Sequence, residues 1–95
     1  MKIKIKLSTP IEINGVKTDT IVLREPTVGD SLDVQKLAPN DDDQREVLML
    51  ARLADISPED LKRMGMKDFR RMQKGYLRLV AVGEGEDEGI VELAA

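Results

Sequence analysis

The sequence predicts an α+β domain: an N-terminal antiparallel β-hairpin, then three to four short helices and a disordered acidic C-terminal tail. Before residue 24, apolar and polar residues alternate with a period of two, as in half-buried strands. From residue 27 the apolar residues recur at helical spacing, and after residue 82 glycines alternate with acids. A chain of 95 residues is long enough for one core, so we expect residues 1–82 to form a single domain and residues 83–95 the tail.

The hairpin is predicted over residues 2–23, with an Asn-Gly pair at residues 14–15 that tolerates the positive φ of a type I′ turn. A strictly regular hairpin would place Ile21 and Leu23 on the face that carries the lysines. One extra residue near residues 8–10, where a proline cannot donate a ladder hydrogen bond, would move both onto the apolar face. We therefore predict a bulged or bent first strand, whose apolar face packs on the helices or on another chain.

Capping residues begin the first two predicted helices. Thr27 is a candidate N-cap for a helix that ends near residue 37. The apolar stripe of this helix is thin and consists of Val28, Leu32 and either Val34 or Gln35. The acids at residues 41–43 are typical of a second helix start, because carboxylates complement the helix dipole there. This helix, which ends near residue 54, is apolar over much of its circumference and is expected to be central.

Two further helices are predicted in the C-terminal half of the domain. Ser57 is a candidate cap with a proline at the first helical position, and Gly65 is expected to close that short helix. Asp68 is a candidate cap for a last helix that runs to about Val82. Gly75 inside it costs about 1 kcal/mol relative to alanine, which predicts close packing or a local bend at that position.

The composition excludes several classes of function. The chain has no Cys and no His, which removes disulfides, thiolate and imidazole metal sites, and the usual Ser-His and Cys-His couples. A net charge of −3 argues against general nucleic-acid binding. No apolar run approaches the roughly 18 residues of a membrane span, and the N-terminus lacks the apolar stretch of a signal peptide. We expect a soluble, non-enzymatic, non-exported binding protein without a cofactor.

One short motif gives an alternative function. The letters Gly-Asp-Ser-Leu at residues 29–32 match a hydrolase signature, but no histidine is present to take the serine proton. The same letters match acyl carrier proteins, in which this serine carries a phosphopantetheine arm. Such carriers are all-helical, whereas Ser31 follows a predicted hairpin. A polar first helical turn is the simpler interpretation, and an acyl-carrier-like protein modified at Ser31 remains the alternative.

Two surfaces are candidates for partner binding. A Met-rich apolar set, which forms either core or an adaptable groove for partner helices, consists of Met49, Leu53, Met64, Met66, Phe69, Met72 and Tyr76. A basic stripe on the last helix consists of Arg70, Arg71, Lys74 and Arg78. A solvated helix face is the simpler interpretation of the stripe. It is also open to phosphates, as in a small nucleic-acid-binding regulator, or to the acidic tail.

Several ordered runs of the sequence resemble one known family. The runs are Thr9-Pro10-Ile11-Glu12, Asn14-Gly15, Leu23-Arg24-Glu25-Pro26-Thr27-Val28-Gly29-Asp30, Leu50-Ala51-Arg52-Leu53, Ser57-Pro58-Glu59-Asp60-Leu61 and Asp68-Phe69 through Gln73 to Tyr76-Leu77. Over about residues 3–80 the chain resembles the tail assembly chaperones of contractile-tailed (Mu-like and related) bacteriophages. The most specific run is the one at residues 23–30.

The resemblance implies a non-catalytic protein of the host bacterial cytoplasm that is absent from the mature virion. Such chaperones coat the long helical tape measure protein and help tail tube subunits polymerise around it. The implied partners are therefore the tape measure protein, the tail tube protein and further copies of the chain itself. Many such families also have a longer, frameshifted form, which a protein sequence alone does not reveal.

Overall fold

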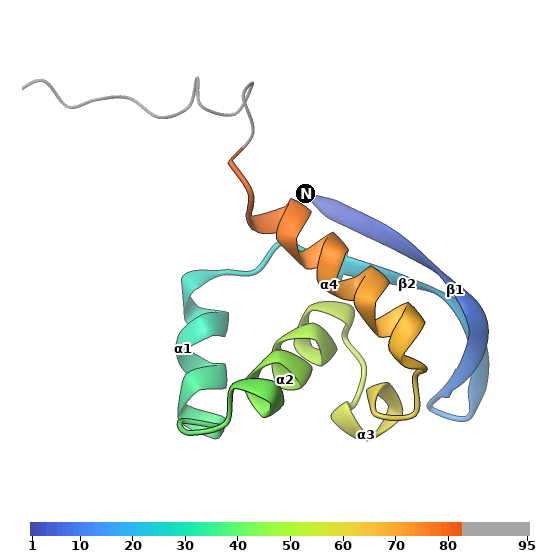
Figure 1. Cartoon of the computed structure of the whole chain (residues 1–95), viewed down its shortest axis with the longest axis horizontal. Coiled ribbons are helices and arrows are strands. Elements are labelled where there is room, and N and C mark those ends of the chain that lie inside the picture. Colours follow the sequence, from blue (N-terminus) through green and yellow to red (C-terminus); the bar gives the residue numbers. More distant parts are fainter. Residues whose placement is uncertain (83–95) are drawn as a thin grey trace, which may run out of the picture.

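A computed structural model describes residues 1–82 and shows a two-stranded antiparallel sheet with helices packed on one side of it (Figure 1). The elements are β1 (Lys2–Ile13), β2 (Val16–Arg24), α1 (Val28–Leu37), α2 (Asp42–Ala54), α3 (Pro58–Leu61) and α4 (Met66–Val80). This order confirms the predicted α+β fold of a hairpin followed by helices. The predicted acidic tail lies outside the described residues.

The hairpin contains the predicted irregularity in β1. Lys6 of β1 pairs with Thr20 of β2, and the next pair is Ile11 with Thr18. Between these two pairs β1 advances by five residues and β2 by two, so β1 has three extra residues there, not one. An odd number of extra residues exchanges the two faces of the strand, because side chains alternate with a period of two. Ile5 therefore pairs with Ile21, and both are buried together with Leu23. The bulged strand and its apolar face on the helices are confirmed.

The carboxylate of Asp68, in the first turn of α4, holds this bulge. It accepts hydrogen bonds from the backbone N–H of Ser8 at 2.9 Å, from the Ser8 hydroxyl at 3.0 Å and from the backbone N–H of Thr9 at 3.2 Å. The prediction that Asp68 caps α4 is therefore wrong, because its carboxylate accepts hydrogen bonds from the backbone N–H groups of the bulge and not from those of its own helix. Gly65 occupies the N-cap position and does not close α3, which ends at Leu61.

α2 is the central helix, as predicted. Its side chains Leu50, Ala51 and Leu53 are buried, and it packs against α1, α3, α4 and β2. Asp41 caps it by accepting a hydrogen bond from the backbone N–H of Gln44 at 3.0 Å. Because one helix contacts most other elements, the core is organised around α2 and the inner face of the hairpin.

α4 lies against the hairpin at Gly75, where the structure confirms the predicted close packing. A Cβ atom at this position would lie 2.8 Å from Cδ1 of Ile5, 3.4 Å from Cδ1 of Leu23 and 3.5 Å from Cγ2 of Ile3. The missing side chain lets the helix approach the sheet, which offsets the lower helix propensity of glycine. The helix ends at Val80, two residues before the predicted end.

Candidate functional site

The position of α1 creates the main surface feature of the molecule. Within residues 1–82, α1 packs against α2 but not against α4. Of the predicted apolar stripe, Val28 and Leu32 are 79% and 55% exposed, so the prediction is wrong for these two residues, whereas Val34 is buried. The buried residues of α1 are Asp30 and Val34, which lie one turn apart on the same face. The helix is turned so that Asp30 and Val34, and not Val28 and Leu32, meet the rest of the protein.

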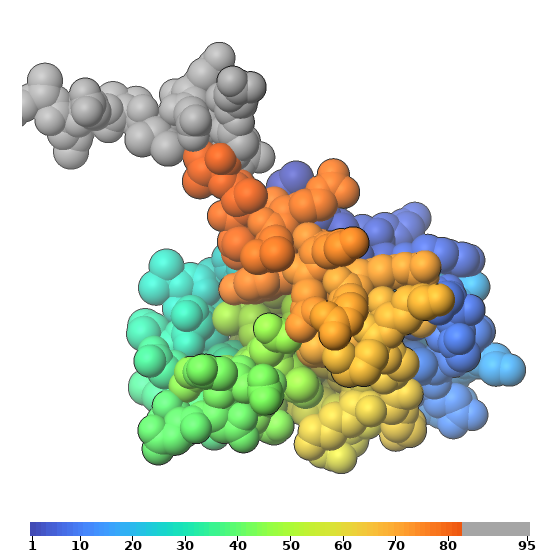
Figure 2. All heavy atoms as spheres, viewed as in Figure 1, coloured from blue at the N-terminus to red at the C-terminus, as the bar shows by residue number. Residues whose placement is uncertain are grey.

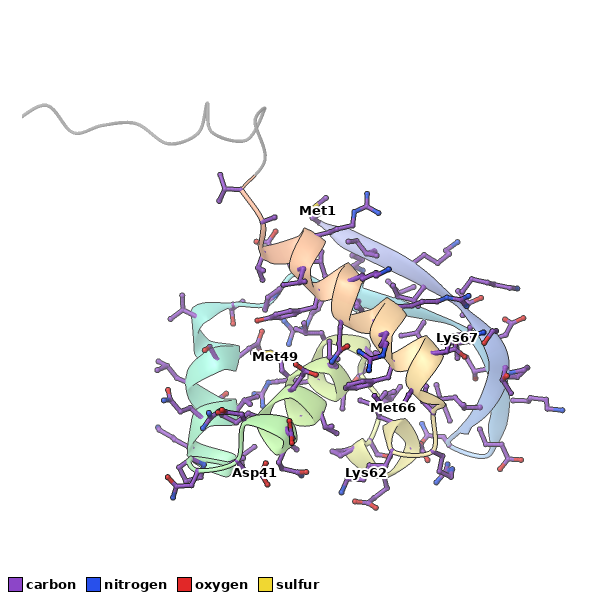
Figure 3. The ribbon with its side chains drawn as sticks, in the orientation of Figure 1. Met1, Asp41, Met49, Lys62, Met66 and Lys67 are labelled. Carbon is purple, nitrogen blue, oxygen red and sulfur yellow. The ribbon has the colours of Figure 1, made fainter. Side chains whose placement is uncertain are left out.

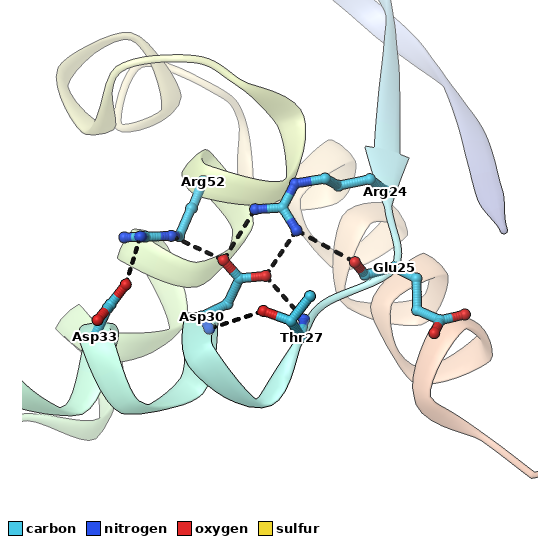
Figure 4. A network of polar contacts seen from close by, with 6 residues as sticks. All are labelled: Arg24, Glu25, Thr27, Asp30, Asp33 and Arg52. Carbon is cyan, nitrogen blue, oxygen red and sulfur yellow. Dashed lines mark hydrogen bonds and ion pairs between the residues drawn. The ribbon is translucent and has the colours of Figure 1, made fainter.

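A network of charged side chains holds the N-terminal end of α1 (Figure 4). Arg24, at the end of β2, donates to both carboxylate oxygens of Asp30 at 2.6 and 2.9 Å. Arg52 on α2 donates to Asp30 at 2.9 Å and to Asp33 at 2.7 Å. The network therefore joins the strand, α1 and α2 at one point.

Thr27 and Asp30 complete this network as a capping box. The Thr27 hydroxyl accepts from the backbone N–H of Asp30 at 3.0 Å, and the Thr27 backbone N–H donates to the Asp30 carboxylate at 2.8 Å. The Arg24 guanidinium and the Thr27 amide outweigh burial and hold the pKa of the Asp30 carboxyl well below its usual range. The specific run at residues 23–30 is thus a structural joint between strand and helix.

Ser31 follows this joint and carries the acyl-carrier alternative. It is exposed on α1, and the aspartate before it belongs to the network of ion pairs. The described chain also contains the hairpin that the all-helical carriers lack. In the structure, the Asp-Ser-Leu sequence at residues 30–32 therefore belongs to the capped N-terminal part of α1.

An open groove lies between α1 and α4, with α2 as its floor. Its volume is about 570 Å³. Figure 2 shows the face of the molecule on which α1, α2 and α4 meet around it. The apolar lining consists of Val34, Met49, Leu50, Tyr76 and Leu77, and the polar lining of Ser31, Gln35, Arg45, Glu46 and Gln73. The groove combines an apolar interior with a polar rim, the pattern of a binding surface for an apolar partner.

Polar contacts fix the rim of the groove. The guanidinium of Arg45 donates to the backbone carbonyl oxygens of Ala38 at 2.9 Å and Pro39 at 2.8 Å, and so holds the C-terminal end of α1 to α2. The amide of Gln73 on α4 donates to the carboxylate of Glu46 on α2. Hydrogen bonds at the rim therefore join α2, the floor of the groove, to the helix on either side of it.

The structure divides the predicted Met-rich set into groove and core. Met49 on α2, labelled in Figure 3, and Tyr76 on α4 line the groove. Leu53, Met64 and Met72 are buried, and Phe69 packs half-buried against the same core. Met66 is exposed at the start of α4 and does not line the groove (Figure 3).

Three apolar groove residues were missed from the sequence: Val34, Leu50 and Leu77. Leu77 was the detectable one, since it is an apolar residue outside the buried side of α4 and is 62% exposed. The other two belong to the ordinary apolar faces of their helices. Only the gap between α1 and α4 turns them into lining residues.

The basic stripe lies on the exposed face of α4, between the side that faces β1 and the rim of the groove. Its members, Arg70, Arg71, Lys74 and Arg78, are all exposed. Arg71 donates to the Asp68 carboxylate at 3.1 Å and to the backbone carbonyl oxygen of Lys6 on β1 at 3.3 Å, which places the stripe beside β1. The stripe shares no residue with the lining of the groove but adjoins its rim, because Lys74 lies one turn before Leu77. The nucleic-acid alternative rests on the stripe alone.

Comparison with known proteins identifies the family. Residues 4–80 match a family described as phage tail assembly chaperone proteins, E, or 41 or 14. Curated proteins and solved structures gave no significant match. No helix within residues 1–82 is long and apolar enough to cross a membrane. Because the match extends from β1 to the end of α4, the chain belongs to the phage tail assembly chaperone family.

Proposed function

We propose that this protein binds the tape measure protein of a phage tail, keeps it soluble and promotes assembly of the tail tube around it. The action is binding without catalysis. The observation that carries the proposal is the groove between α1, α2 and α4, which has an apolar floor and is open to solvent. Family membership supports an assembly role, and the groove supplies a surface for it.

The dimensions and lining of the groove suit an apolar helix face. Its volume of about 570 Å³ lies within the range of roughly 300–1,000 Å³ that is common for ligand sites. A helix presents apolar side chains at positions i, i+3, i+4 and i+7, which enter a groove of this kind as a row of anchors. Met49 at the floor adapts to anchors of different shape, because its unbranched side chain has several rotatable bonds.

A long partner helix offers many such rows, so several copies of the chaperone are expected to bind along one tape measure protein. Each apolar side chain that a groove buries contributes about 1.5–3 kcal/mol before the cost of association. Weak contacts of this size become effective when neighbouring copies bind the same rod. We infer action in the host bacterial cytoplasm, before the tube closes, and absence of the chaperone from the mature virion.

Co-expression with a tape measure protein of the same phage tests the proposal. The wild-type chaperone is expected to raise the soluble fraction of the tape measure protein and to copurify with it. Leu77→Lys places a charge in the groove and is expected to abolish both effects. Leu37→Lys is the matched control, because Leu37 is 66% exposed against 62% for Leu77 and does not line the groove.

Both substitutions replace exposed leucines near helix C-termini, where lysine is tolerated, so the two proteins are expected to have similar melting temperatures. If Leu37→Lys and Leu77→Lys reduced copurification equally, the groove would not be the binding surface. If wild-type chaperone left the solubility of the tape measure protein unchanged, the proposed function would fail as a whole.

A further inference from the structure

We propose that the basic stripe of α4 binds the acidic residues 84–88 of the same chain, and so occupies a surface that would otherwise be open to other anionic partners. This inference concerns the cations of α4, none of which lines the groove, and does not rest on the proposed function. It rests on the distribution of charge, on the contacts that the stripe lacks, and on the short covalent connection between stripe and acids.

The charge of the chain is divided between its two parts. All 15 basic residues lie at or before Arg78, and 13 of the 18 acids lie within residues 1–82, so that part carries a net charge of +2. Residues 83–95 contain the other 5 acids and no base, which gives −5 and restores the total of −3. The acidic segment therefore follows a positively charged domain.

Most of the stripe has no acidic partner in the described part of the chain. Arg71 pairs with Asp68 at 3.1 Å, whereas Arg70, Lys74 and Arg78 make no ion pair within residues 1–82. Three neighbouring cations on one helix face repel one another, and an acidic segment relieves that repulsion.

Several cations elsewhere are already paired, although five single lysines outside the stripe also make no ion pair within residues 1–82. Lys6 on the hairpin already pairs with Asp19 at 3.0 Å. Arg24 and Arg52 are engaged by Asp30 at 2.6 and 2.9 Å. The stripe is therefore the nearest group of unpaired cations that the acids meet along the chain.

The covalent connection keeps the acids close to the stripe. Arg78 lies in the last turn of α4, which ends at Val80. Glu86 is the fourth residue after Val82, a reach of at most about 14 Å, and Lys74 lies about 6 Å along the helix from Arg78. A tether this short gives an effective concentration in the millimolar range or above. Acids that follow a helix C-terminus also face the negative end of its dipole, so nearby cations are needed to offset that repulsion.

The test is NMR of the full chain labelled with ¹⁵N. The double substitution E86Q/E88Q removes two negative charges from the segment. The control E25Q/D43N removes two negative charges from residues that make no ion pair within residues 1–82. We expect E86Q/E88Q to move the backbone amide signals of Arg70, Lys74 and Arg78, and the control to leave them in place. The shifts should shrink several-fold from about 0.1 M to about 1 M salt, as the Debye length falls from roughly 10 to 3 Å.

A charge exchange provides the second arm. K74E/R78E should abolish the response of the stripe to the segment, and K74E/R78E combined with E86K/E88K should restore a salt-dependent response. Amide shifts confined to residues 80–83, or equal at both salt concentrations, would overturn the inference. A response that appears only as the protein concentration rises would assign the acids to a neighbouring copy, and would likewise refute binding within one chain.

Discussion

Substitution of Asp30 by asparagine tests how α1 is held in place. The change removes the negative charge but keeps the shape of the side chain, and so weakens the contacts to Arg24 at 2.6 and 2.9 Å and to Arg52 at 2.9 Å. A hydrogen bond to a charged group contributes about 1.5–3 kcal/mol, and breaking a buried ion pair costs about 3–5 kcal/mol. The Asp30 side chain is only 8% exposed, but its partners are 41% and 38% exposed and regain water. We therefore expect a loss of about 2–3 kcal/mol in the free energy of unfolding, below the fully buried case.

The assay is urea unfolding at neutral pH followed by far-UV circular dichroism. Asp33→Asn is the matched control, because Asp33 lies on the same helix and pairs with the same Arg52 at 2.7 Å, but its side chain is 52% exposed. An exposed ion pair contributes about 0.2–1 kcal/mol, so the control is expected to lose less than about 1 kcal/mol. Equal losses for the two variants would refute the argument that burial of Asp30 determines the strength of the network.

Three further outcomes follow from the packing, the backbone and the ionisation of the domain. Gly75→Val should lower the free energy of unfolding by about 1–3 kcal/mol, because its Cβ would lie 2.8 Å from Cδ1 of Ile5, and a lower melting temperature checks this. Asp55→Gly should raise the free energy of unfolding by about 0.5–1 kcal/mol in urea titrations, because Asp55 ends α2 with a φ of 56°. Folding lowers the pKa of the Asp30 and Asp68 carboxyls, so the unfolded chain binds more protons in acid and stability should fall below about pH 4. Urea midpoints at pH 7 and in this acidic range check the direction, and Asp30→Asn should reduce the dependence on pH.

The features that the sequence predicted correctly depend on neighbouring residues. Thr27, Asp41 and Ser57 begin their helices with side-chain caps that reach only three residues along the chain. The positive φ angles of the turn, 52° at Asn14 and 79° at Gly15, are conformations that these two residue types tolerate by themselves. The bulge was predictable because the apolar residues of the two strands do not share one parity, although its size of three residues was not.

The features that were missed depend on residues far apart in the chain. Asp68 looked like a helix cap, but its partner Ser8 lies 60 residues away, and no local pattern contains that contact. Likewise, the apolar residues of α1 predicted that the helix would bury a face containing Val28. In the structure the orientation of the helix is set by Asp30, which is buried and bound by two arginines. The position of the groove and most of its apolar lining were missed for the same reason, since the groove is a gap between helices and not a property of either one.

The wall of the groove that α1 forms is held mainly by polar contacts. Arginines hold both ends of this helix, with Arg24 and Arg52 at its start and Arg45 at the loop that follows it. Val34 is its only buried apolar residue, so little tightly interlocked surface resists a small swing of the helix. Long guanidinium side chains can follow such a swing while their bonds persist, and the core beneath α2 is left undisturbed. Under the proposed function, a wall held in this way would let one groove accept client segments of different bulk.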